Sequence, residues 1–108
     1  MVTTYKVLGQ SNPAATTPTT LYTVPGGTQT VCSTLSVCNT GVATTYRIAV
    51  RPAGATLANL HYLVYGATIA ASDSTLLTLG ISLATTDVVT VYAGTADVAF
   101  TLFGAEIT

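Results

Sequence analysis

Two cysteines and one histidine are the side chains of this sequence best suited to nucleophilic or metal chemistry. Both cysteines lie in TVCSTLSVCN, residues 30–39, where the alternation of a strand places Cys32 and Cys38 on one face. The opposite face then carries Val31, Leu35 and Val37. At about 3.3 Å per residue their Cα atoms are roughly 20 Å apart, whereas a disulfide needs about 4.4–6.8 Å. The spacing therefore predicts two free, packed thiols, which suits a reducing compartment.

The same separation prevents the two cysteines from binding one metal ion together, and His61 adds only one further ligand. No nucleophile elbow, phosphate-binding loop or zinc-ligand spacing occurs. Asp73, Asp87 and Asp97 each fall in a turn, where Asp typically bonds to local backbone. We therefore expect no enzyme activity, no metal and no cofactor, and a structural hydrogen bond from His61 beside Tyr62.

Arg47 and Arg51 supply two of the three cationic side chains and lie on one face of the segment TYRIAVR. The other face carries Tyr46, Ile48 and Val50, which are candidates for the core. One interpretation gives the arginines a bidentate contact to a carboxylate on another subunit. The alternative is a solvated face, and the sequence leaves both open.

The sequence contains six tyrosines and no tryptophan, and the tyrosines are a possible platform for stacking on sugars. Their distribution over several predicted strands favours packing in the core and in interfaces instead.

Period-two alternation interrupted by Gly, Pro, Asn and Asp runs through the chain, and no apolar stripe has helical spacing. The pattern predicts about eight short strands and one helical turn near Ala58. Because no segment supplies a crossover helix, we predict an all-β, single-domain antiparallel β-sandwich, jelly-roll-like in its architecture. The turn signal PGG, residues 25–27, predicts a hairpin between strands at 21–24 and 30–38.

Residues 1–20 are predicted to form an N-terminal strand or extended arm, and residues 21–108 the β-sandwich domain. The arm is rich in Pro and Thr between residues 9 and 20. Its tip carries four apolar side chains that we predict to form an interface: Val2, Tyr5, Val7 and Leu8. A strand there can add to the sheet edge of a partner protein. The alternative is an edge strand in the sheet of the same chain.

Only 6% of the 108 residues are charged, and the net charge is −1. Three cations cannot neutralise a phosphate backbone, so we expect no nucleic-acid partner. No apolar run reaches the roughly 18 residues of a membrane span, and MVTTYKVLGQ lacks the basic start of a secretory signal, so the mature chain is expected to begin at Met1. Small soluble monomers usually carry more charge, which predicts a homo-oligomer whose surface is partly covered by protein.

Several pieces between Leu21 and Thr108 resemble small virion structural proteins of tailed bacteriophages: LYTVP, SVCN, RIAVRPAG, HYLVYG and LFGAEIT. The resemblance implies a head decoration (cement) protein or a neck or tail component, assembled in the host cytoplasm, and does not decide between them. A single small domain with a short arm suits repeated placement on a shell, so we expect a decoration protein, bound in the virion to the major capsid protein or other virion proteins. The resemblance also implies a trimer, since such proteins often gather at local threefold positions. A neck, tail or fibre component and a carbohydrate-binding adhesive module remain the alternatives.

Overall fold

The computed structural model describes residues 1–108 and contains eight strands and two short 3-10 turns. The strands are β1 (Thr3–Ser11), β2 (Thr19–Thr23), β3 (Gln29–Asn39), β4 (Thr44–Arg51), β5 (Tyr62–Ile69), β6 (Ser74–Leu83), β7 (Val88–Ala93) and β8 (Val98–Ile107). The turns η1 (Pro52–Gly54) and η2 (Asn59–His61) lie between β4 and β5. The predicted number of strands and the helical turn near Ala58 are confirmed. No helix is long and apolar enough to cross a membrane.

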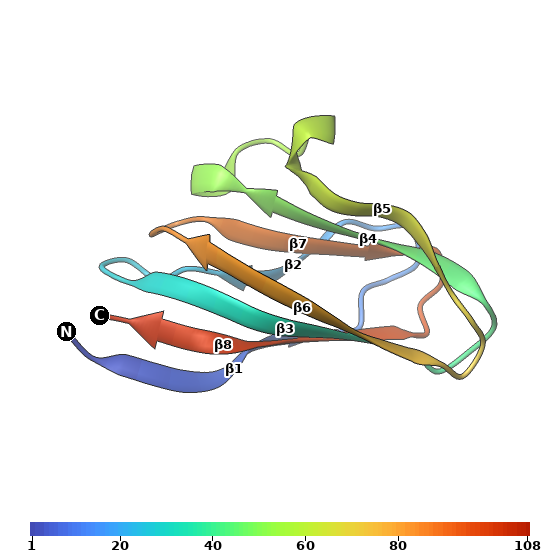
Figure 1. Ribbon diagram of the computed structural model, residues 1–108. Helices are drawn as coiled ribbons and strands as arrows, with labels where there is room; N and C mark the ends of the chain where they lie inside the picture. The colour runs from blue at the N-terminus through green and yellow to red at the C-terminus, as the bar shows by residue number, and fades with distance from the viewer.

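The strands form two antiparallel four-stranded sheets, in the orders β1-β8-β3-β6 and β2-β7-β4-β5, packed as two layers (Figure 1). The predicted all-β sandwich is confirmed, and this strand order is that of a jelly roll. Of the strands that follow one another in sequence, only β4 and β5 pair directly.

The predicted hairpin across residues 25–27 is wrong, because β2 and β3 belong to different sheets. The Pro-Gly-Gly turn fixes a change of chain direction. It does not specify which strand lies alongside, since that depends on the winding of the whole sandwich.

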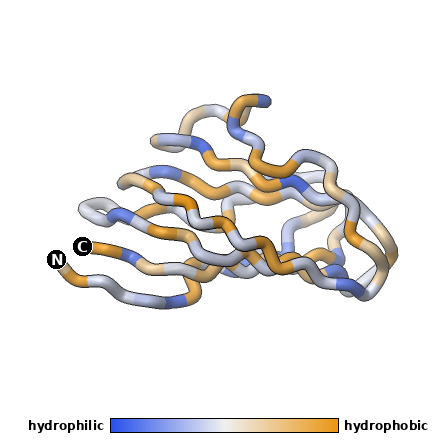
Figure 2. The backbone as a smooth tube through the Cα atoms, in the orientation of Figure 1, coloured by the Kyte–Doolittle hydropathy of each residue, from blue (hydrophilic) through white to orange (hydrophobic).

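Apolar side chains from both sheets fill the space between them. Apolar and polar residues alternate along several strands (Figure 2). Tyr46 and Phe100 meet edge to face in this core, with ring centroids 6.4 Å apart. The largest fully buried apolar side chains are Phe100, Leu35, Ile48, Ile69, Leu102, Val24, Val37, Val89, Val91 and Val98.

A row of bulges crosses the sheet β1-β8-β3-β6 on either side of Phe103 of β8. The pairing skips Leu8 on β1, Ser33 on β3, and two residues of β6 that include Gly80, whose φ is +61°. Gly104 is required at this point because a methyl group there would overlap the carbonyl oxygen of Val31. The bulges reverse the inside–outside alternation along β1 and β3.

The bulge at Ser33 overturns two sequence predictions. Cys32 points into the core and is 0% exposed, whereas Val31 is 39% exposed on the outer face. Cys38 lies beyond the bulge on the outer face and is partly exposed. The cysteines therefore lie on opposite faces of β3, and not on the shared face that strict alternation predicts.

The N-terminal strand β1 is an edge strand of the sandwich itself. It pairs antiparallel with β8 from Thr3↔Ile107 to Ser11↔Phe100, and Val2 and Thr108 extend the pairing by two backbone hydrogen bonds. The boundary expected at residue 20 thus does not separate β1 from the sheet, and β2 begins at Thr19.

Candidate interaction surfaces

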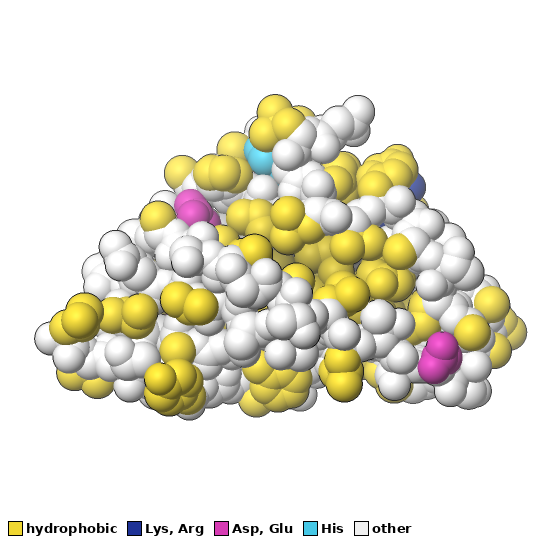
Figure 3. Space-filling model, in the orientation of Figure 1, with side chains coloured by type: hydrophobic (Ala, Val, Ile, Leu, Met, Phe, Trp, Pro, Cys, Tyr) yellow, Lys and Arg dark blue, Asp and Glu magenta, His cyan; other side chains and the backbone are white.

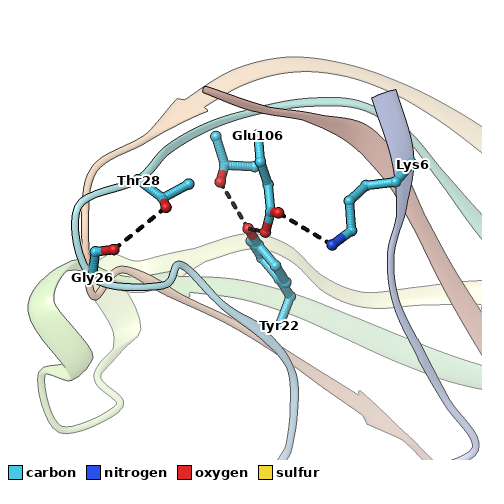
Figure 4. Close-up of polar contacts among 6 residues, drawn as sticks. Lys6, Tyr22, Gly26, Thr28 and Glu106 are labelled. Carbon is cyan, nitrogen blue, oxygen red and sulfur yellow. Dashed lines mark hydrogen bonds and ion pairs between the residues drawn. The ribbon is translucent and has the colours of Figure 1, made fainter. Parts of the chain in front are cut away.

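The edges of β1 and β2 meet along one side of the sandwich, which we call the closed margin. Tyr22 of β2 donates a hydrogen bond of 2.6 Å from its hydroxyl to Glu106 Oε2 of β8 (Figure 4). Lys6 Nζ of β1 donates to Glu106 Oε1 at 3.1 Å, and the Tyr22 hydroxyl also lies 2.8 Å from Thr30 Oγ1 of β3. Glu106 and the Tyr22 hydroxyl together therefore connect β1, β3 and β8 of one sheet to β2 of the opposite sheet.

Burial and hydrogen bonding shift the ionisation of this group of side chains. The Tyr22 hydrogen bond is the largest cause that lowers the pKa of Glu106, and the bond and charge of Lys6 add to it. Burial, followed by the hydrogen bond to Glu106, raises the pKa of Tyr22 to about 12. At neutral pH a carboxylate thus accepts from a neutral hydroxyl and an ammonium, which is a stable arrangement.

Gly9 completes the closed margin by close backbone contact. A methyl group at this position would overlap the carbonyl oxygen of Leu21 in β2. The two edges are therefore held both by polar bonds and by an approach that only glycine permits.

The edges of β5 and β6 form the opposite side, which we call the open margin. Each of these strands pairs with one neighbour only, β5 with β4 and β6 with β3. Inward-facing apolar side chains remain partly exposed there, and they form a continuous apolar surface between the two strands (Figure 3). They are Val64 and Ala67 of β5 and Leu77, Leu79 and Ile81 of β6.

β6 is an edge strand whose one protective feature is the bulge at Gly80. Its ten residues, STLLTLGISL, contain no charge and no proline, which are the common devices that keep an edge from pairing with another chain. Leu76 on its outer face is 69% exposed. The open margin thus combines unpaired backbone donors and acceptors with the partly exposed apolar side chains between β5 and β6.

A shallow groove of about 480 Å³ runs over the outer face of the sheet that contains β1 and β8. Register pairs Tyr5 with Ala105 and Ala105 with Val31, so the three side chains share this face, and Phe103 follows them on β8. Tyr5 is 84% exposed and Phe103 is 38% exposed. The groove therefore offers a mainly apolar contact surface.

The outer face of the other sheet carries a cluster of Arg47 and three tyrosines, which we call the arginine–tyrosine cluster. The Arg47 guanidinium carbon lies 4.1 Å from the ring centroid of Tyr65 and 4.2 Å from that of Tyr92. Tyr62 meets Tyr65 edge to face, with centroids 4.8 Å apart. The guanidinium is thus stacked between aromatic rings from β5 and β7.

Arg51 has a structural role. Its Nε donates to Thr90 Oγ1 at 3.1 Å, and its Nη1 donates to the carbonyl of Ala55 at 3.0 Å. These bonds hold the loop after η1 against β7, so the two arginines do not act as a pair.

His61 and Asp87 also serve the loops. His61 Nδ1 accepts a hydrogen bond from the backbone N–H of Ala58 at 3.0 Å, which confirms the predicted structural bond. The Asp87 carboxylate accepts from the backbone N–H groups of Ala53 and Ala84, both at 2.9 Å.

Cys32 is a buried thiol in the core. Burial raises the pKa of Cys32 to about 11, so this thiol stays protonated at neutral pH. No group of three or more His, Cys, Asp or Glu side chains lies together in a metal-binding arrangement.

The predicted interface residues fall on different surfaces. Val2, Tyr5 and Val7 are exposed on β1 or just before it, whereas Leu8, at the bulge, packs against the core. Arg47 and Arg51 lie on the outer face of the other sheet, so the structure does not bring the two sets together.

Sequence reasoning missed the contributions of Val31 and Phe103 to the groove and the convergence of three tyrosines on Arg47. The groove and the cluster depend on strand order and on bulges, and neither can be recognised from the alternation of residues within one strand.

Comparison with protein-family models, with curated proteins and with solved structures finds no match to this chain.

Proposed function

We propose that the chain is a non-enzymatic virion structural protein of a tailed bacteriophage that acts as a capsid decoration (cement) protein. The observation that carries the proposal is the open margin, where a ten-residue uncharged edge strand borders exposed apolar side chains. Such a surface favours association with another protein chain over the monomeric state. The fold alone carries no weight, because jelly rolls serve many unrelated functions.

In this proposal, two surfaces make two different contacts. The groove around Tyr5 and Phe103 contacts the major capsid protein, and the open margin joins copies of the chain into a homo-oligomer, with a trimer as the favoured symmetry. Contacts of this kind stabilise a shell because each copy links neighbouring capsid subunits.

Quantitative mass spectrometry of purified virions tests the location. We expect many copies per particle, in fixed proportion to the major capsid protein. A few copies per particle would instead support a neck or tail component, and absence from particles would refute a virion role.

Binding of the purified chain to shells that lack it tests the groove. Phe103→Ser should reduce binding because it removes apolar area from the groove. Leu60→Ser is the matched control, since Leu60 is 83% exposed just before β5 and outside the groove. Equal loss of binding in both variants, or in neither, would argue against the groove as the contact.

A further inference from the structure

The three cationic side chains of this protein differ in the groups that they contact. Lys6 pairs with Glu106, and Arg51 bonds to Thr90 and to loop carbonyls. The Arg47 guanidinium donates no side-chain hydrogen bond within the chain, although two tyrosine rings stack on it. A guanidinium carries five N–H donors, and the stacking leaves these donors without a partner.

The geometry of the arginine–tyrosine cluster favours one kind of ligand group. The ring centroids lie 4.1 and 4.2 Å from the guanidinium carbon, whereas the N–H donors lie in the plane of the guanidinium. The flanking rings restrict rotation of the side chain, which lowers the entropic cost of binding. A planar carboxylate that approaches in that plane receives two parallel hydrogen bonds.

A hollow of about 290 Å³ is lined by Asn59, Tyr62 and Tyr65, and Tyr65 is also one of the two rings that contact Arg47. Its volume is near the lower end of small-molecule pockets, which start at about 300 Å³, and suits one ring of a ligand. Tyr65 is 62% exposed and meets Tyr62 at an interplanar angle of 82°. The two rings therefore form an apolar corner, and the Asn59 amide adds a donor and an acceptor at its rim.

We propose that this site binds a hexuronic acid residue of an acidic polysaccharide. The carboxylate pairs with Arg47, the apolar C–H face of the sugar ring lies against Tyr62 or Tyr65, and Asn59 bonds to a ring hydroxyl. The net charge of −1 gives the protein no general attraction for anions, so recognition depends on the local site. A carboxylate on a partner protein would satisfy Arg47, but it would leave the tyrosine corner and Asn59 without a role.

The inference is independent of the proposed capsid contact, because the site lies on the outer face of the sheet that does not contain the groove. A chain bound through the groove could still expose this site to glycans on a cell surface. Failure to bind sugar would leave the particle experiments above unaffected.

Titration of the full chain with methyl glucuronide, followed by amide chemical shifts, tests the proposal. We expect shifts at Asn59, Tyr65 and Arg47. Methyl glucoside, which has a hydroxymethyl group in place of the carboxylate, should bind at least about tenfold more weakly because the charged bidentate contact is lost.

Variants place the binding at the cluster. Arg47→Lys keeps the charge but loses the planar pair of donors, and it should weaken glucuronide binding by about tenfold. Tyr65→Ala should weaken it as well. Tyr5→Ala, an exposed tyrosine on the other sheet, is the matched control and should bind as the wild type does.

Three results would overturn the proposal. The first is equal affinity for the glucuronide and the glucoside, and the second is unchanged affinity in Arg47→Lys. The third is binding of N-acetylglutamate amide as tight as that of the glucuronide, which would assign the site to protein carboxylates.

Discussion

The two margins of this sandwich differ in how the edge strands of the two sheets are joined. At the closed margin, β1 and β2 are joined by the Tyr22–Glu106–Lys6 bonds and by the close approach at Gly9. At the open margin, no such bonds join β5 to β6, and apolar side chains that face the interior remain partly exposed. One margin is completed within the chain, whereas the other leaves two strand edges and their apolar side chains partly exposed.

This difference separates stability from assembly. When one partner of a buried hydrogen bond is removed, the other partner is left unsatisfied and the free energy of unfolding falls. Changes at the closed margin should therefore destabilise the folded chain. Changes on the surface of the open margin remove few contacts within the chain. They should alter association and leave the free energy of unfolding nearly unchanged.

Gly9→Ala should produce the largest effect, because its methyl group overlaps the carbonyl oxygen of Leu21 and pushes β1 away from β2. We expect a loss of about 3 kcal/mol in the free energy of unfolding, the upper end of the usual cost of overpacking. Urea denaturation measures it. Gly26→Ala is the matched control, since a methyl group there meets nothing within 4 Å. Equal stability of the two variants would show that the closed margin is not tightly packed.

Tyr22→Phe should have the next largest effect, since it removes the hydroxyl that bonds to Glu106 and Thr30. Leaving these two groups without their partner should cost about 1–2 kcal/mol. Tyr5→Phe removes a hydroxyl from a tyrosine that is 84% exposed, and it should change stability by less than about 0.5 kcal/mol. Similar losses in the two variants would contradict a special role for the Tyr22 bonds.

The acid limb of the stability curve should show a smaller effect of Glu106. Because the pKa of Glu106 is lowered in the folded state, the unfolded chain binds more protons. Its contribution is complete above the ordinary pKa of 4.5 and is lost as the pH falls through the lowered value. Glu106→Gln should flatten this part of the curve, and Tyr22→Phe should flatten it partly. An unchanged slope in Glu106→Gln would assign the acid sensitivity to other carboxyl groups.

Local sequence signals were sufficient for the strands but not for their partners. Alternation and turn residues located all eight strands because most strands direct alternate side chains toward the core, which is a property of adjacent residues. The pairing of β2 with β7 instead of β3 involves residues about 70 positions apart, which no local pattern encodes.

The candidate surfaces were less predictable than the fold for a related reason. The bulge at Ser33 moves Val31 to the outer face, and it is visible only when β3 is aligned with β6 and β8. Likewise, Arg47 could be placed on an outer face from its own strand, whereas Tyr65 and Tyr92 join it through the pairing of β4 with β5 and β7.

The central claim is that the open margin is an assembly surface, and analytical ultracentrifugation of the wild type and Thr78→Lys tests it most directly. Thr78 is exposed on β6, where a lysine should oppose pairing with another chain and change the free energy of unfolding by less than about 0.5 kcal/mol. We expect a wild-type mass well above the 11.0 kDa of one chain, and a mass close to 11.0 kDa for the variant. A wild-type mass of one chain at every concentration, or the same oligomer in both proteins, would contradict the account.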